Sequence, residues 1–267
     1  MKKYFMGLLV YLAISPCIAY AHNTDQTLKL AVASNFRTAA IEIADIFTSQ
    51  TGYAVNISSA STGKLYAQII NGAPFDIFLA ADESTPMQLE SNGLAVDGTR
   101  FTYAYGRLVL LNLKVSNNSK QNVVDFERFN KIAIANPKLA PYGAAALDVL
   151  KNLELYESVV KKLVYGENIN QAFQYVASKS TEIGFVALSQ VRSYYSDTFK
   201  GYWIIPDSLY RPIPQQAILL SRARESKIAY EFMRFLKSTF AKKIMEENYG
   251  YYIEKDDKTA KLGNSTH

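Results

Sequence analysis

Two pairs of small polar residues are the best candidates in this chain for holding a ligand. Ser34 and Asn35 directly follow an apolar run that predicts a buried strand, and Ser61 and Thr62 follow a second predicted strand. A helical pattern begins soon after each pair. The first N–H groups of a helix have no partner within it, and this end of a helix carries a partial positive charge. The two pairs therefore predict an anion site in which both turns face one ligand.

The residue types in these turns favour an anion that carries no proton of its own. Hydroxyl and N–H groups donate hydrogen bonds, and a fully ionised oxyanion offers only acceptor oxygens. Phosphate partly retains a proton near neutral pH, and neither turn contains the carboxylate that would accept it. The turns thus favour a fully ionised tetrahedral dianion over phosphate. Each pair also has a simpler interpretation as a helix cap, and a capping hydroxyl can also point at a ligand.

Strand and helix patterns alternate through the first third of the chain and position both turns. Apolar runs predict strands at residues 28–33, 53–57 and 76–81, and helical spacing predicts helices at residues 38–49, 64–71 and 83–92. This order predicts a mostly parallel sheet with helices on both of its faces.

Two long apolar runs, at residues 102–113 and 213–220, divide the chain into two lobes because each is longer than one small sheet needs. Between them we predict strands at 131–135, 162–165, 182–187 and 203–205, and helices at 144–153, 170–178 and 188–195. Helices at 226–237 and 240–249 would return to the first lobe. We expect an α/β protein with lobe 1 from 22–105 and 214–255, lobe 2 from 106–213, a frayed polar tail at 256–267, and a ligand cleft between the lobes.

The N-terminal residues 1–21 have the pattern of a secretory signal peptide. Lys2 and Lys3 precede an apolar run at residues 5–14 that is too short to span a bilayer, and small residues up to Ala21 suit cleavage. We therefore expect a periplasmic protein, exported and cleaved near Ala21.

Composition argues against several function classes. Without the signal peptide the chain has 27 basic and 24 acidic residues, scattered along the sequence, which argues against a nucleic-acid partner. Cys17 is the only cysteine, so the mature chain cannot form a disulfide. The only histidines are His22 and His267, which excludes a histidine metal site or a Ser-His-Asp triad inside the fold. Asp82 is expected to cap the helix that follows it.

Six sequence strings, in order, resemble the molybdate-binding proteins of ABC importers. They are AVASNF at 31–36, SSASTGKLYAQ at 58–68, NGAPFDIFLAAD at 71–82, RFTYAY at 100–105, NPKLAPYG at 136–143 and GFVALSQ at 184–190. The resemblance extends from about residue 28 to residue 252. It implies a two-lobed periplasmic receptor, each lobe a mostly parallel sheet flanked by helices, that closes on a tetrahedral dianion.

The resemblance also implies which residues bind the anion. Family binding positions carry over onto Ser34, Asn35, Ser61, Thr62, Tyr142 and the backbone N–H of Ile169. Better-known members place a ligand tyrosine after a Gly-x-Val tripeptide, and here that position is Ala187. Tyr142 instead matches a second branch, in which a Pro-Tyr-Gly turn supplies the phenol. Lys64, just past the second turn, is expected to be solvated.

The function implied is capture of molybdate or tungstate and delivery to a membrane ABC permease by a monomeric receptor. No cofactor is expected, and no metal coordinated by protein atoms, because molybdate would be bound through its oxygens. The alternatives are a receptor of the same fold for sulfate, thiosulfate or an organic anion, an exported hydrolase, and a periplasmic adaptor. The missing histidines, and the lack of a pattern for an activated nucleophile, disfavour the hydrolase.

Overall fold

The computed structural model describes residues 27–112, 125–194 and 201–254. The predicted signal peptide and the predicted tail at 256–267 lie outside the described residues. Within these described ranges, no helix has the length and apolar character needed to cross a membrane.

The first sheet has the strand order β2-β1-β3-β10-β4. Its strands are β1 (Leu28–Ala33), β2 (Val55–Ala60), β3 (Ile77–Leu79), β4 (Phe101–Gly106) and β10 (Ile213–Leu219). Strand β10 is antiparallel to both of its neighbours, and the other strands all run in one direction. The predicted strand at 53–57 is corrected to 55–60, so that Ser58 to Ala60 belong to the sheet and only Ser61 separates β2 from the next helix.

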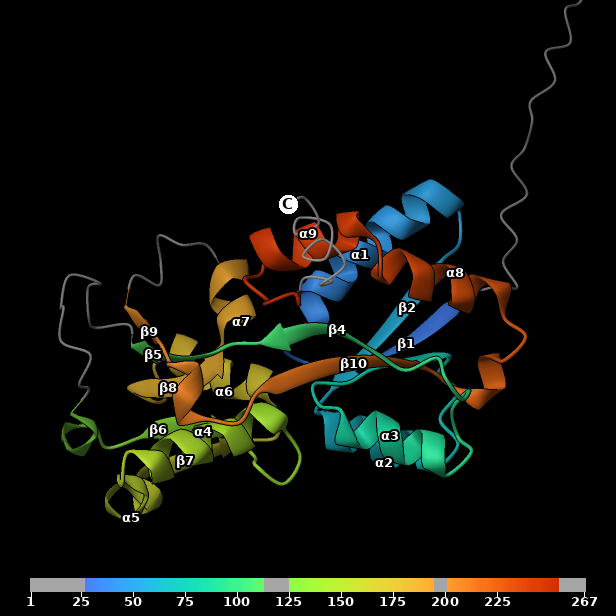
Figure 1. Ribbon diagram of the computed structural model, residues 1–267. Helices are drawn as coiled ribbons and strands as arrows, with labels where there is room; N and C mark the ends of the chain where they lie inside the picture. Colours follow the sequence, from blue (N-terminus) through green and yellow to red (C-terminus); the bar gives the residue numbers. More distant parts are fainter. Residues whose placement is uncertain (1–26, 113–124, 195–200, 255–267) are drawn as a thin grey trace, which may run out of the picture.

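Helices cover both faces of the first sheet (Figure 1). They are α1 (Arg37–Thr51), α8 (Lys227–Leu236) and α9 (Thr239–Glu247) on one face, and α2 (Thr62–Ile70) and α3 (Ser84–Ser91) on the other. Successive strand residues point to opposite faces, and β1 follows this rule: Leu30 and Val32 pack with α1 and α8, whereas Ala31 packs with α2 and α3. A strand buried on both faces explains the continuous apolar run at this point of the sequence.

The second sheet has the order β7-β6-β8-β5-β9. Its strands are β5 (Leu108–Asn112), β6 (Ile132–Ala135), β7 (Leu163–Gly166), β8 (Ile183–Ala187) and β9 (Tyr202–Ile204), and its helices are α4 (Pro141–Asn152), α5 (Tyr156–Val159), α6 (Ile169–Ala177) and α7 (Leu188–Ser193). Strands β6, β7 and β8 are parallel, and β5 runs against its neighbours. The two-lobed α/β fold expected from the sequence is confirmed.

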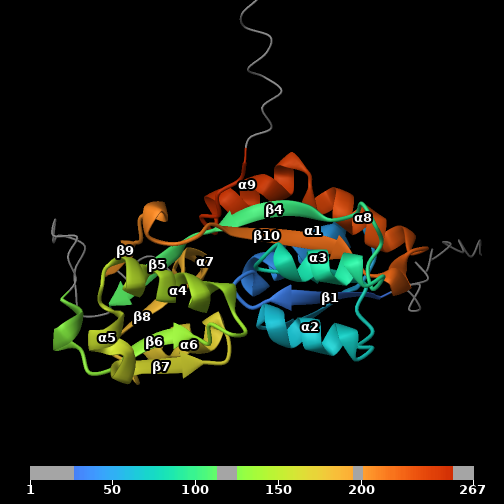
Figure 2. The ribbon, with the colours of Figure 1, turned by 60° about the horizontal axis from the view of Figure 1, so that its bottom comes forward.

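Two segments connect the lobes side by side, β4 to β5 and β9 to β10 (Figure 2). The long strand predicted at 102–113 is corrected to two strands, β4 and β5, interrupted at Arg107. Gly106, the last residue of β4, lies against the second lobe: a Cβ atom at this position would overlap the hydroxyl of Tyr142 and the side-chain amide of Gln215. The glycine therefore permits close packing of the crossing strands on the cleft.

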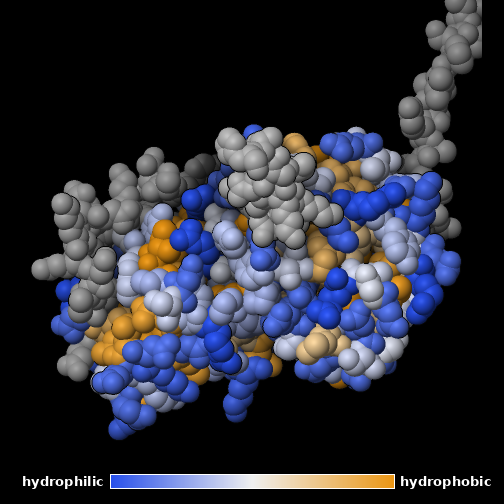
Figure 3. Space-filling model, in the orientation of Figure 1, coloured by the Kyte–Doolittle hydropathy of each residue, from blue (hydrophilic) through white to orange (hydrophobic). Residues whose placement is uncertain are grey.

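Hydrophilic and hydrophobic residues alternate over both lobes on the face shown in Figure 3. The large hydrophobic side chains that are exposed come from different elements: Ile70, Met87, Tyr165, Tyr194, Ile204, Tyr230, Phe240 and Tyr252. Scattered residues of this kind are normal on a solvent-facing surface.

Gly106→Ala is expected to lower the free energy of unfolding by about 1–3 kcal/mol, because the added methyl group overpacks the crossing strands. Urea denaturation measures the change. In a Tyr142→Phe background the cost should shrink, since the nearest atom to the new methyl is the Tyr142 hydroxyl. An unchanged midpoint for the single variant would contradict this account of the close packing.

Candidate anion-binding site

All six residues that the sequence nominates line one small pocket between the lobes. Ser34, Asn35, Ser61, Thr62, Tyr142 and Ile169 surround it together with Ala33, Ala81, Ala140 and Pro141. Its volume is about 10 Å³, which is on the scale of a single water molecule. A pocket of this size suits one small inorganic ion rather than an organic anion.

The pocket lies where helices begin. Strands β1 and β2 are parallel neighbours, so their carboxyl ends share one sheet edge and bring Ser34-Asn35 beside Ser61-Thr62. Across the cleft, α4 follows β6 and α6 follows β7, which are also parallel neighbours. The N-termini of α2, α4 and α6 therefore meet at the pocket, and each presents a partial positive charge to it.

Tyr142 occupies the first turn of α4, which begins at Pro141 instead of the predicted residue 144. Proline at the first helical position is favourable because the missing N–H would have no helical partner. The phenol side chain is almost fully buried, at 2% exposure.

The hydroxyl of Ser61 is buried and has no hydrogen-bond partner among the described residues. Ser61 is the N-cap residue of α2, yet its side chain makes no capping hydrogen bond. In the other turn, the N-cap position of α1 falls on Phe36. Helix capping therefore does not account for the polar side chains of either turn. Leaving a buried hydroxyl unpaired costs about 1–3 kcal/mol, which an acceptor in the pocket would offset.

Further donors converge on the same point. The Thr62 hydroxyl accepts from the backbone N–H of Ala81 at 3.1 Å, which leaves its own proton to donate. The side chain of Asn168 caps α6 by accepting from Gln171 N–H at 3.1 Å. Among the described residues, the backbone N–H groups of Asn35 and Ile169 have no acceptor. An oxyanion would supply acceptors for the Thr62 hydroxyl and for the backbone N–H groups of Asn35 and Ile169.

The side chain of Asn35 has a different role from its backbone. Its amide donates to Gln215 Oε1 at 2.9 Å and to the Tyr251 hydroxyl at 3.2 Å. The backbone carbonyl of Asn35 accepts from Ser189 Oγ of the second lobe and from the Tyr251 hydroxyl, each at 2.9 Å. The side-chain amide is thus engaged in a buried network, and the backbone N–H is the group left for a ligand.

Gln215, Tyr103, Ser189 and Tyr251 complete this network, and the sequence analysis did not nominate them. Gln215 Nε2 donates to the Tyr142 hydroxyl at 3.2 Å, and Gln215 Oε1 accepts from Tyr103 at 3.0 Å. The one available signal is a pair of glutamines, at 215 and 216, inside an otherwise apolar crossing strand.

The groups that line the pocket are neutral. Burial raises the pKa of Tyr142 and of Tyr103 well above the ordinary value of 10, so that both phenols remain protonated near neutral pH. Asp82, Glu83 and Asp148 line a larger cavity that shares Ala81, Ala140 and Pro141 with the pocket, and no carboxylate is among the described residues that line the pocket itself. The pocket therefore offers neutral donors to a ligand and no carboxylate acceptor.

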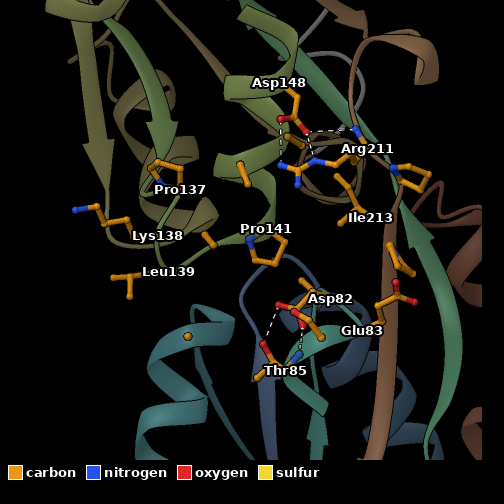
Figure 4. A pocket seen from close by; sticks show the side chains of 18 residues that line it. Asp82, Glu83, Thr85, Pro137, Lys138, Leu139, Pro141, Asp148, Arg211 and Ile213 are labelled. Atoms are coloured by element: carbon orange, nitrogen blue, oxygen red, sulfur yellow. Dashed lines mark hydrogen bonds and ion pairs between the residues drawn. The ribbon is translucent and has the colours of Figure 1, made fainter. Parts of the chain in front are cut away.

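That larger cavity, of about 650 Å³, opens beside the pocket (Figure 4). Arg211 lines it but is held by Asp148 through two bonds, Nε to Oδ2 at 2.8 Å and Nη2 to Oδ1 at 3.1 Å. Asp82 accepts from the backbone N–H of Thr85 at 2.8 Å and from its hydroxyl at 3.0 Å, which confirms its predicted capping role. Asp82, Glu83 and Asp148 in its wall and the neutralised Arg211 guanidinium make this cavity a poorer site for an anion than the pocket, although Lys138 also lines it.

The lobes touch each other at the cleft rim. Gly63 N–H donates to the carbonyl of Leu139 at 3.0 Å, and Lys64 Nζ pairs with Glu167 Oε2 at 2.8 Å. Lys64, predicted to be solvated, is 46% exposed and forms this ion pair with the other lobe. Its charge is therefore engaged at the rim, and the pocket residues themselves remain uncharged.

Among the residues the structure describes, no group of three or more His, Cys, Asp or Glu side chains is placed to hold a metal ion.

Residues 28–252 match the family model of the bacterial extracellular solute-binding proteins. This chain belongs to that family. A molybdate-binding protein of Azotobacter vinelandii is 44% identical over 228 residues, which cover 85% of this chain and 90% of the relative. A molybdate-binding protein of Rhodobacter capsulatus is 41% identical over 224 residues, covering 84% and 87%. The predicted family is thereby confirmed, and with it a receptor rather than an enzyme.

Solved structures of solute-binding proteins share the fold. The periplasmic molybdate-binding protein of Azotobacter vinelandii superposes with a TM-score of 0.78 at 36% identity, covering 85% of this chain and all of that one. A sulfate-binding protein of Mycobacterium tuberculosis superposes with a TM-score of 0.73 over 90% of this chain and 91% of its own, but at 11% identity. The second likeness shows the fold alone.

Ser61→Ala is expected to leave the unfolding free energy of the anion-free protein unchanged or to raise it, because the lost hydroxyl has no partner to lose. Ser189→Ala serves as the matched control: it removes the bond to the Asn35 carbonyl and should cost about 1 kcal/mol. Both values come from urea denaturation after exhaustive dialysis. If Ser61→Ala lowers the unfolding free energy as much as Ser189→Ala does, the Ser61 hydroxyl has a hydrogen-bond partner in solution and this account is wrong.

Proposed function

We propose that this solute-binding protein captures molybdate, and also tungstate, in the periplasm and delivers it to the permease of an ABC importer. The observation that carries the proposal is the pocket between the lobes, where neutral donors from both lobes converge without a carboxylate. Two relatives at 41–44% identity that are named molybdate-binding proteins support the choice of ligand.

The proposed mechanism is lobe closure. Hydroxyls and N–H groups of Ser34, Asn35, Ser61 and Thr62 hold the anion from the first lobe, while Tyr142 and the Ile169 N–H complete its shell from the second. Contacts at the rim, such as Gly63 with Leu139, then favour the closed form. Molybdate is the cargo in this proposal and not a cofactor, and it is held through its oxygens.

We further propose that the protein is exported by its N-terminal signal peptide and cleaved near Ala21. The mature receptor then works as a monomer and binds no nucleic acid. The leader pattern supports export, and the scattered exposed hydrophobic residues support a monomer. A receptor for sulfate is the second candidate, because sulfate is also a proton-free tetrahedral dianion that the same neutral donors would accept.

Molybdate is expected to raise the melting temperature of the protein, since a ligand bound only by the folded state adds about 2.7 kcal/mol of stability at 100 times its Kd. Thermal scans with molybdate, tungstate, sulfate and phosphate measure the effect. Calorimetric titration of molybdate in excess sulfate then separates the two candidate ligands. If only sulfate raises the melting temperature, the protein is a sulfate receptor. If none of the four anions raises it, the proposed function is wrong.

Thr62→Ala and Ser34→Ala should each weaken molybdate binding by about 1–3 kcal/mol, because one ligand oxygen loses its donor in a desolvated cleft. Tyr142→Phe should weaken binding for the same reason. Thr85→Ala is the matched control, since its hydroxyl lies in the neighbouring cavity on Asp82 and should leave affinity unchanged. Wild-type affinity in both Thr62→Ala and Ser34→Ala would place the ligand elsewhere.

A further inference from the structure

Gln215 connects both lobes to the crossing strand β10. Its side chain is fully buried and makes three hydrogen bonds, with Asn35 and Tyr103 of the first lobe and with Tyr142 of the second. Gln215 thus bonds both to the Tyr142 phenol and to Asn35, the residue of the lobe 1 turn that itself also contacts this phenol. Its identity therefore bears on the shape and the polarity of the whole pocket.

The hydrogen bonds fix which way the Gln215 amide points. Its carbonyl oxygen accepts from the Asn35 amide and from the Tyr103 hydroxyl, which fills both lone pairs. Reversing the amide would set the N–H of Gln215 against the N–H of Asn35, two donors facing each other. With Asn35 oriented as in the structure, where its amide also donates to the Tyr251 hydroxyl, the amide nitrogen of Gln215 faces Tyr142 and the phenol oxygen accepts from it.

This arrangement determines what Tyr142 can offer a ligand. A hydroxyl has one proton to donate, and it can also accept. Because the Gln215 amide already donates to the phenol oxygen, the phenol proton is left for another acceptor. Gly106 leaves room for these two groups to meet, since a Cβ atom there would overlap both the Tyr142 hydroxyl and Gln215 Nε2.

We infer that Gln215 is a positioning residue that makes Tyr142 a pure donor toward the pocket, and that it thereby selects oxyanions without a proton of their own. The inference rests on the proposed function. Without the amide, the phenol is free to rotate and to accept a hydrogen bond, as a hydrogen phosphate ion requires. Gln215 does not touch the anion in this account and acts through Tyr142.

The first test is Gln215→Glu, an isosteric change that puts a carboxyl group into the network. When ionised, this carboxylate accepts the Tyr142 proton and withdraws it from the pocket, and its charge repels the anion. Molybdate affinity should fall by roughly 100-fold at pH 8. It should recover toward pH 5, where a protonated carboxyl donates to Tyr142 as the amide does.

The surroundings of position 215 make this pH profile readable. The titratable groups that face it are the phenols of Tyr103 on β4, Tyr142 on α4 and Tyr251 after α9, with Tyr210 beyond Tyr142. Burial raises the pKa of each of these four phenols above its ordinary value. They stay protonated from pH 5 to pH 8, so a pH dependence peculiar to Gln215→Glu reports the introduced carboxyl group.

The second test is a double-mutant cycle on binding. Gln215→Leu should weaken molybdate binding roughly tenfold and raise the affinity for phosphate relative to molybdate. In a Tyr142→Phe background the same change should have no further effect. Gln216→Leu is the matched control: it is a buried glutamine on the same strand, bonded to Arg100 and Thr102 away from the pocket, and should leave affinity and selectivity unchanged.

Calorimetric titrations of sodium molybdate and sodium phosphate into wild type and variants supply all of these readouts. Fitted stoichiometry reports the folded fraction, so a loss of stability is not mistaken for a loss of affinity. Two results would overturn the role of Gln215 without touching the proposed function. One is a molybdate affinity of Gln215→Glu that does not change with pH, and the other is additive effects of Gln215→Leu and Tyr142→Phe on that affinity. Absence of binding by wild type would instead contradict the proposed function.

Discussion

The pocket between the lobes is defined by buried hydrogen-bond donors that have no acceptor within the described part of the protein. A folded protein buries polar groups only with partners, because each unpaired group costs about 1–3 kcal/mol. Here the hydroxyl of Ser61 and the first N–H groups of several helices converge on one small pocket. The side chains of Asn35, Gln215 and Tyr142 are hydrogen-bonded to one another, so at this site the donors without acceptors are those that line the pocket. The protein is thereby prepared for a ligand that only accepts.

The architecture supplies this constraint through ordinary rules of parallel sheets. Parallel strands end at a common edge, and the helix that follows each strand begins there. At the pocket this rule acts through β1 and β2 in one lobe and through β6 and β7 in the other. The crossing strands then set the two edges face to face. Glycine at position 106 and glutamine at 215 allow the strands to pass close to the site while remaining bonded to it.

Much of this was accessible from the sequence, because the signals were local. The period of apolar residues located the strands, and Ser34, Asn35, Ser61 and Thr62 stood out as small polar residues directly after two of them. The boundaries moved where local and tertiary preferences differed: β2 continues through Ser58 and Ser59, which pair with β1 despite their polar side chains. Proline began α4 earlier than the apolar pattern indicated.

The buried network was not accessible in the same way. Gln215 and Gln216 are identical and adjacent, yet the pleat of β10 directs one side chain to Tyr142 and the other to Arg100. Which of the two does so depends on the register with β4, and that register shifts between these very residues. A sequence pattern carries no record of such an irregularity. Ser189 and Tyr251 are likewise joined to Asn35 only by the approach of distant segments.

The pairing of β4 with β10 has a mechanical consequence. The two strands are hydrogen-bonded as far as Gly106 and Ile213, and beyond that pair they enter the second sheet separately. Two adjacent connecting segments permit one lobe to rotate about a single hinge axis relative to the other, but they resist sliding and twisting between the lobes. In the proposed closure, this tether would keep the second half of the binding shell at high effective concentration, and an ion held by one half would meet the other half along a nearly fixed arc.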